Sequence, residues 1–258
     1  AEMITVTFLG HSGFLAELPS VALLFDWTEG ELPSLPEDKP LYVFVSHAHP
    51  DHFDPKIFAL DQWKGEVLDD VDGGNRDIYF LLGHGITLDV RRLQRWGISP
   101  ETAGKARVRK GGQSLSLPRA EIETLSSTDE GVAFLVTADG LTLFHAGDLN
   151  WWHWEGEDTA WNRNMEVNFK RYTEPLRGRR IDLAMLPLDP RLGEDGFRGP
   201  SYLLETADIR RFLPMHQWGD FGFTEKFLTR YPEFAEQTVP VAGAGQVFSL
   251  REGPDSGN

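Results

Sequence analysis

The stretch Ser46–His52 reads SHAHPDH and directly follows an apolar run, Leu41–Val45. It holds three of the eight histidines of this 258-residue chain, together with an aspartate and a proline. A short apolar run predicts a buried strand, so the histidines are expected on a loop at the edge of a sheet. Ligands in such a place are exposed to a pocket yet held by a rigid scaffold. The stretch therefore indicates a functional site rather than core packing.

The residue types in this stretch are those that bind divalent metals. Neutral imidazoles and ionised carboxylates that converge on one point hold metals such as zinc, and a hydrolytic site keeps one position open for water. His47, His49, Asp51 and His52 supply such groups within six residues, and Pro50 stiffens their loop. One histidine in a polar loop would be unremarkable, but this ordered set predicts a metal site.

The motif His47-Ala-His49-Pro-Asp51-His52 resembles the HxHxDH signature of the metallo-β-lactamase fold superfamily. Three further residues match that family's pattern: Asp26 in LLFDW, Asp148 in FHAGDLN and His216 in LPMHQW. The resemblance spans most of the chain, from Phe8 to His216. The sequences GHSGF around His11 and HAGD around Asp148 are similar to the branch that includes L-ascorbate-6-phosphate lactonase and N-acylphosphatidylethanolamine phospholipase D.

The strand and helix patterns agree with the fold that this resemblance implies. Strands are expected at Met3–Leu9, Val21–Phe25 and Leu41–Val45, and again between Ala106 and Gly147. Helices are expected at Pro55–Trp63, Leu88–Trp96, Thr159–Leu176 and Ser201–Phe212. Two β-rich halves flanked by helices predict an α/β fold, an αββα sandwich of two mixed sheets. We expect residues 1–250 to form a single domain and residues 251–258 a flexible tail.

The resemblance also implies two sets of metal ligands that share Asp148. The first metal would take His47, His49 and Asp148, and the second would take Asp51, His52, Asp148 and His216. A further histidine of the first site is missing, because the chain reads ETLSSTDEGVAFLV where the family usually has it. Asp129, His145 or water could replace it, or the first metal could be weak or absent.

Three other residues near the expected site have more than one interpretation. Asp26 is better suited as an acceptor that fixes a histidine tautomer than as a ligand. His145 stands three residues before Asp148, so strand alternation favours a structural role about as much as ligation. His11 either reaches the pocket or lies on a turn in solvent.

The resemblance implies a metal-dependent hydrolase in which a metal-activated hydroxide attacks an ester-type bond, that is, a phosphodiester, a lactone or a related ester. Asp51 would be the catalytic residue that orients the attacking water. The cofactor would be one or two divalent ions, with zinc favoured and manganese or iron also compatible. The alternative is a metal-binding sensor or scaffold protein without turnover, because the first site lacks its histidine. The third hypothesis for the function is iron-dependent oxygen chemistry.

The amino-acid composition favours some classes of binding partner over others. The formal charge is −15, so the protein is expected to repel nucleic acid, and a small-molecule substrate is expected, with phosphate-bearing compounds among the candidates. Trp151, Trp152 and His153 could form a pocket wall or core packing, and Arg191 could bind a substrate anion. The chain has no cysteine, and it has no apolar run long enough to span a membrane. These features predict a cytoplasmic protein and give no indication of oligomeric state.

Overall fold

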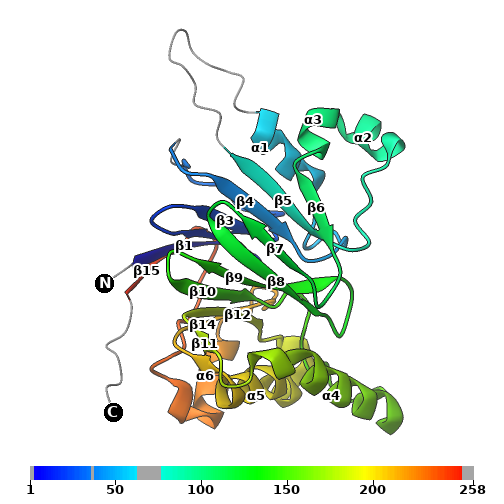
Figure 1. The fold of residues 1–258 in the computed structure, drawn as a ribbon. Helices are drawn as coiled ribbons and strands as arrows, with labels where there is room; N and C mark the ends of the chain where they lie inside the picture. The colour runs from blue at the N-terminus through cyan, green and yellow to red at the C-terminus, as the bar shows by residue number, and fades with distance from the viewer. Residues whose placement is uncertain (1–2, 36–37, 63–76, 252–258) are drawn as a thin grey trace.

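Two large β-sheets are packed face to face in the computed structural model, which describes residues 3–35, 38–62 and 77–251 (Figure 1). The first sheet has the order β15 (Val247–Arg251), β1 (Met3–Gly10), β2 (Gly13–Glu17), β3 (Ala22–Phe25), β4 (Leu41–Val45), β5 (Ile78–Gly83) and β6 (Ala106–Arg109). Strands β15, β1, β2 and β3 pair antiparallel, whereas β3 to β6 are parallel. The first sheet is therefore mixed.

The second sheet is also mixed. Its order is β14 (Phe212–Met215), β12 (Leu183–Pro187), β10 (Leu141–His145), β9 (Val132–Ala138), β8 (Ala120–Ser126) and β7 (Ser114–Leu117). Strands β7 to β10 are antiparallel, and β10, β12 and β14 are parallel. A short ribbon pairs β11 (Arg180–Ile181) with β13 (Asp208–Ile209).

Helices cover the outer face of each sheet (Figure 1). Beside the first sheet lie η1 (Pro55–Phe58), α1 (Ala59–Gln62), α2 (Val90–Trp96) and α3 (Pro100–Ala103). Beside the second lie α4 (Thr159–Thr173), η3 (Glu174–Leu176), η4 (Pro190–Phe197), α5 (Arg198–Thr206), α6 (Phe223–Arg230) and η5 (Pro232–Phe234). The layers confirm the predicted αββα sandwich.

Strand β4 shows how the sequence produces these layers. Tyr42 and Phe44 point into the apolar core between the two sheets, whereas Leu41, Val43 and Val45 belong to a second core under the helices. Successive side chains of a strand face opposite sides of the sheet, so a strand covered on both sides must be apolar at every position. This explains why the run before SHAHPDH is continuously hydrophobic.

Several predicted elements differ from the observed ones. Strand β2 is absent from the predicted strands, and it forms a hairpin with β1 in which Gly10 pairs with Gly13. The helix expected at Ser201–Phe212 is α5, and it ends at Thr206. Beyond that point the backbone is extended at Ala207 and pairs as β13, so sheet pairing overrides helical spacing. Of the predicted tail, Arg251 closes β15, and residues 252–258 lie outside the described part.

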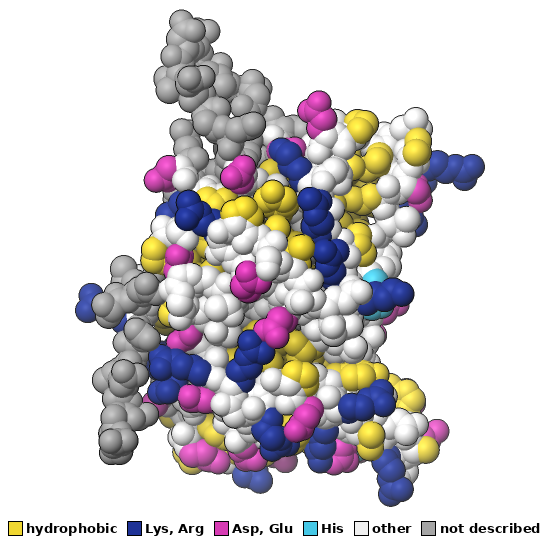
Figure 2. Space-filling view, in the orientation of Figure 1, with side chains coloured by type: hydrophobic (Ala, Val, Ile, Leu, Met, Phe, Trp, Pro, Cys, Tyr) yellow, Lys and Arg dark blue, Asp and Glu magenta, His cyan; other side chains and the backbone are white. Residues whose placement is uncertain are grey.

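The surface shows mixed charge on the face in Figure 2, where lysines and arginines are interspersed with acidic side chains rather than gathered into one basic patch. A duplex nucleic acid is bound mainly through such a patch, and this face offers none. Within the described ranges, no helix combines the length and the apolar character needed to cross a bilayer.

Candidate metal centre

The residues of the centre follow the carboxyl ends of strands from both sheets. In the first sheet Asp26 follows β3, and Ser46 and His47 follow the parallel strand β4. In the second sheet Asp148, Asp189 and His216 follow β10, β12 and β14, which are parallel to one another. Parallel strands end at one edge, so each sheet gathers its polar residues there. His11 joins them from the β1–β2 turn, where its carbonyl accepts a hydrogen bond from the His216 N–H at 3.2 Å.

Backbone strain is concentrated at this edge. Among the described non-glycine residues, five have positive φ, and four of them lie at the centre: His11, Asp26, His216 and Trp218. The left-handed region costs an L-residue roughly 1–2 kcal/mol, and such strain tends to occur at functional sites. Gly147 is a glycine for a related reason: its φ is +55°, and a Cβ there would lie 2.6 Å from the Cβ of Ser46.

The Asp148 carboxylate lies between two groups of histidines. Its Oδ2 is 3.1 Å from Nε2 of His47, and its Oδ1 is 3.0 Å from Nε2 of His52 and 3.1 Å from Nε2 of His216. The ligand atoms fall into two compact sets, one of His47, His49 and Asp148 and the other of His11, Asp51, His52 and His216. A single carboxylate therefore presents one oxygen to each set.

Hydrogen bonds behind the histidines determine which nitrogen faces Asp148. Nδ1 of His52 donates to Asp26 at 2.7 Å, and Nδ1 of His216 donates to Asp189 at 2.8 Å, because a carboxylate only accepts. Ser46 Oγ donates to Asp26 at 2.6 Å and therefore accepts from Nδ1 of His47 at 2.9 Å. Each Nε2 is thereby left free to act as a metal ligand.

The donor atoms fit a cation better than they fit each other. The Nε2 atoms of His47, His52 and His216 lie 3.0–3.1 Å from Asp148, but neither these buried atoms nor Oδ1 of Asp148 has a well-aligned hydrogen bond. Buried polar atoms in native proteins are normally paired, because an unpaired one loses its hydration without compensation. Three imidazole nitrogens around one carboxylate are satisfied together when divalent ions are bound among them. These residues therefore fit the metal that the motif implies.

The protonation states of the buried histidines and of Asp148 are set by the charged side chains in contact with them. Burial alone would lower the pKa of His216, but its close contacts with Asp148, Asp189 and Asp51 raise it to about 10. Similar contacts with Asp148, Asp26 and Asp51 raise the pKa of His52 well above its ordinary value, against the effect of burial. Burial likewise opposes ionisation of Asp148, but its three histidine neighbours hold its pKa well below the usual range. Without metal, both histidines are thus cationic near neutral pH.

Metal binding is expected to release protons from these two histidines. Ligation requires neutral imidazole, so filling the site near pH 7 should release about two protons, and the apparent metal affinity should rise with pH toward pH 10. The measurement is the calorimetric enthalpy of zinc binding in buffers of different ionisation enthalpy. A binding enthalpy that is independent of the buffer would show that the histidines are already neutral.

Asp189 is a residue of the centre that sequence reasoning missed. It is fully buried, and besides His216 it accepts hydrogen bonds from Arg191 and from Trp218 Nε1 at 3.2 Å. Its only sequence signal is its place directly after a buried apolar strand, which is also the place of Asp26 after β3. Burial opposes its ionisation, but His216 and Arg191 lower its pKa to about 2.

Replacing Asp189 with alanine should weaken metal binding, because the acceptor that orients His216 is lost. Removing such an acceptor typically costs about 10-fold to 100-fold in metal affinity. The affinity can be measured by competition with a chromophoric chelator. Asp195→Ala is the matched control, since Asp195 lies in the same segment but pairs with the exposed Arg198. Equal affinities of the two variants would contradict the role given to Asp189.

Asp51 and His11 form the open side of the cluster. Oδ2 of Asp51 is 3.0 Å from Nε2 of His11, 3.3 Å from Nε2 of His52 and 3.6 Å from Nε2 of His216. Burial is the main cause that lowers the pKa of His11, so its imidazole is a neutral donor to Asp51. His11 therefore lies in the cluster rather than on a solvent-exposed turn.

Asp129 and His145 differ in their relation to the centre. Burial and the charge of Asp148 raise the pKa of Asp129, whereas the charges of His47 and His49 lower it, although Asp129 is outside the compact set formed by His47, His49 and Asp148. His145 is fully buried and stacks on Phe25 at 5.0 Å. Its Nε2 donates to the Ser12 carbonyl at 2.8 Å, and its Nδ1 accepts from the Gly147 N–H at 3.2 Å. With both nitrogens engaged, His145 supports the Gly147 turn and is not placed to ligate a metal.

The residues expected to form a pocket wall take different places. Trp152 is buried, donates from Nε1 to the Asp148 carbonyl at 2.8 Å and lies against the His216 ring. Arg191 binds Asp189 and lies over the rings of Trp154 and Trp218. Trp151 instead packs against Phe169 of α4 and Tyr202 of α5, away from the cluster. His153 is half-buried and belongs to neither ligand set among the described residues.

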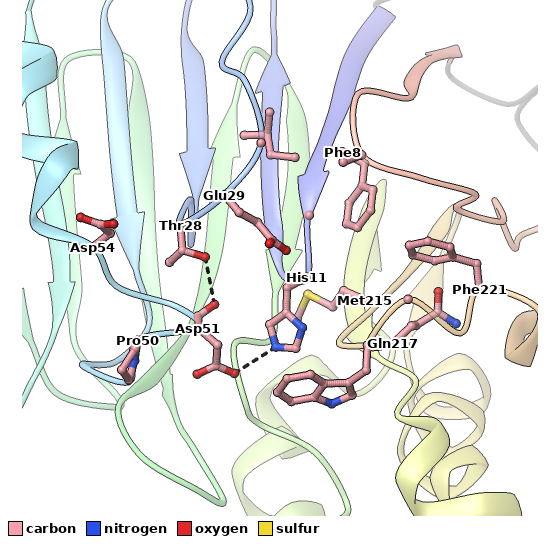
Figure 3. Close-up of a pocket in the computed structure, with 16 residues that line it drawn as sticks. Phe8, His11, Thr28, Glu29, Pro50, Asp51, Asp54, Met215, Gln217 and Phe221 are labelled. Carbon is pink, nitrogen blue, oxygen red and sulfur yellow. Dashed lines mark hydrogen bonds and ion pairs between the residues drawn. The ribbon is translucent and has the colours of Figure 1, made fainter.

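A pocket of about 660 Å³ opens beside Asp51 and His11 (Figure 3). Its walls come mainly from the β1–β2 turn, the segment after β3 and the segment after His216. Neither Arg191 nor residues 151–153 line it. Trp218 does, and its sequence signal was its position two residues after the predicted ligand His216.

Fold and centre together define a metal-binding αββα protein with a ligand set at one edge of its sheets. A family model described as "Beta-lactamase superfamily domain" matches residues 5–153, more than half of the chain. The chain therefore belongs to the β-lactamase superfamily.

Known relatives agree with this assignment. A UPF0173 metal-dependent hydrolase of Opitutus terrae is 29% identical over 229 residues, which cover 82% of this chain and 83% of the relative. A protein of the same name from Desulforamulus reducens is 26% identical over 254 residues, which cover 96% and 97%. Among solved structures, Igni18, a metallo hydrolase from the archaeon Ignicoccus hospitalis, has a TM-score of 0.61 at 17% identity and covers 97% of this chain and 100% of its own. That structural likeness shows the shared fold.

Proposed function

We propose that this metal-dependent hydrolase of the β-lactamase superfamily uses two divalent ions to cleave an ester-type bond in a small molecule, that is, a phosphodiester, a lactone or a related ester. The observation that carries the proposal is the Asp148 carboxylate, which presents one oxygen to each of two sets of ligand atoms. The names of the curated relatives support the reaction class.

The proposed ligands divide between two positions that share Asp148. The first ion would be held by His47, His49 and Asp148, with Asp129 as the fourth protein ligand in place of the missing histidine. The second ion would be held by Asp51, His52, Asp148 and His216. Zinc suits the imidazole nitrogens, and manganese and iron also suit a set this rich in carboxylates. When bound, such ions lower the pKa of a water molecule and polarise the carbonyl or phosphoryl oxygen under attack.

Asp51 is the proposed catalytic residue. Its side chain is one-third exposed, so it touches both the buried cluster and the pocket, where a substrate can enter. The contacts with His11, His216 and His52 hold its pKa far below the ordinary value against the effect of burial, so it remains an ionised acceptor. In that state it can orient the O–H of the attacking water. His11 positions it, because the neutral imidazole donates to Oδ2.

Turnover by a metal-reconstituted preparation tests the proposal. Wild type, Asp51→Ala and the control Glu155→Ala would be loaded with zinc or manganese and assayed on a panel of phosphodiesters, lactones and carboxylic esters. We expect wild type and the control to hydrolyse at least one class, with chelator abolishing turnover and Asp51→Ala losing it. Equal turnover by wild type and Asp51→Ala would contradict the assignment of Asp51.

A second candidate is a metal-binding sensor or scaffold of the same fold. The observation that favours it is the sequence SSTDE at 126–130, which lacks the usual histidine of the first site. Metal-loaded wild type without turnover on any class of the panel would support this alternative.

A further inference from the structure

We propose that the pocket beside Asp51 and His11 binds the part of the substrate that lies away from the reacting bond, and that this part is an apolar group carrying a positive charge, such as a substituted ammonium. The inference rests on the proposed hydrolysis and specifies the substrate for that same site. It is carried by two features of the pocket, its aromatic wall and its uncompensated carboxylate (Figure 3).

One side of the pocket is aromatic. Phe8 and Phe221 meet edge to face, with ring centroids 6.0 Å apart, and both line the cavity. Trp218 lies 4.5 Å from the His11 ring, yet 51% of its surface is exposed. Arg191 lies over the Trp218 ring, so a ligand would contact the part of Trp218 that remains exposed. Aromatic surfaces attract apolar groups and cations.

The other side of the pocket is acidic. Glu29, Asp51 and Asp54 line it, and its lining contains no lysine or arginine. Asp51 is bound to His11, and Asp54 caps η1 by accepting from the Lys56 N–H at 2.9 Å. Glu29 is exposed to solvent at the pocket and has no hydrogen-bond or ion-pair partner among the described residues. Figure 3 shows its carboxylate pointing toward the space between His11 and Phe8.

The neighbouring cations do not pair with Glu29, although Arg191 interacts electrostatically with Asp51. Nζ of Lys56 donates to the Thr28 carbonyl at 2.7 Å and lies over the Trp27 ring, outside the lining. Arg191, a candidate binder of a substrate anion, forms an ion pair with Asp189. Arg198 forms an ion pair with Asp195. A tail that carries phosphate would face the carboxylates of Glu29 and Asp54, since Asp51 is a proposed metal ligand, whereas a cationic tail would gain both Coulomb and cation–π attraction.

Glu29→Gln removes the charge of the partnerless carboxylate and keeps its shape. The matched control is Glu31→Gln, which removes one exposed charge two residues away and outside the lining. The first readout is calorimetric binding of phenyltrimethylammonium to the metal-loaded protein. We expect Glu29→Gln to weaken binding about fivefold, the size of a charge interaction across a few ångströms of partly hydrated space, and Glu31→Gln to leave it unchanged.

The second readout is hydrolysis of two esters of equal shape, a choline ester and its neutral 3,3-dimethylbutyl analogue. We expect wild type and Glu31→Gln to prefer the choline ester in kcat/KM, and Glu29→Gln to lose this preference. Identical binding of phenyltrimethylammonium by all three proteins would overturn the inference. If binding depends on Glu29 but neither ester is cleaved, the pocket assignment stands and the proposed hydrolysis of such esters fails.

Discussion

Asp148→Asn is expected to leave the protein unable to hold either metal firmly and to reduce turnover on the order of 1,000-fold or more, because one carboxylate contributes to both ligand sets. Asparagine keeps the shape of the side chain but removes the negative charge that compensates two cations. The measurement is elemental analysis of the purified variant together with turnover on the best substrate of wild type.

The control for this variant is Glu155→Gln, an exposed carboxylate on the loop that follows Asp148. Circular dichroism would establish that both variants are folded. If Asp148→Asn retained the full metal content of wild type, Asp148 would not be the shared ligand, and the two-ion arrangement would have to be abandoned.

Asp129→Ala is expected to lose one ion per chain while keeping the other. Asp129 interacts electrostatically with His47, His49 and Asp148, and it stands in the segment where the family pattern usually supplies a histidine. Turnover should fall by at least about 100-fold, because the remaining ion acts alone. Asp129→His, which restores the usual residue type, should recover two ions per chain.

Glu130→Ala is the informative control for Asp129. Glu130 is the next residue, and its Oε2 lies 3.3 Å from Nε2 of the half-exposed His49, so it is the other carboxylate near the first site. We expect this variant to keep both ions. Loss of an ion from Glu130→Ala, with none lost from Asp129→Ala, would transfer the ligand role to Glu130.

The sequence predicted those features that depend on local pattern. The HxHxDH motif placed four candidate ligands on one loop after a buried strand, and the structure has them there after β4. Asp26, expected as an acceptor behind a histidine, accepts from His52 Nδ1. The two-sheet sandwich followed from the order of strand and helix patterns, and the comparisons agree with it.

What the sequence did not predict depends on contacts between distant segments. Asp189 supports His216 across 27 positions, and Ser46 connects His47 to Asp26 across 20. Nothing within either segment indicates its partner, because the relation arises when parallel strands end at one edge. Strand β2 and the end of α5 were missed for the same reason, since pairing with neighbouring strands decided their conformation.

The central claim is that one chain holds two ions in ligand sets joined by Asp148, and metal content per chain tests it most directly. Protein purified without chelator and without an affinity-tag metal would be reconstituted with zinc, freed of excess metal and analysed for zinc and protein. We expect two ions per chain. One ion or none would contradict the account, because the first ligand set would then be unable to function as a site.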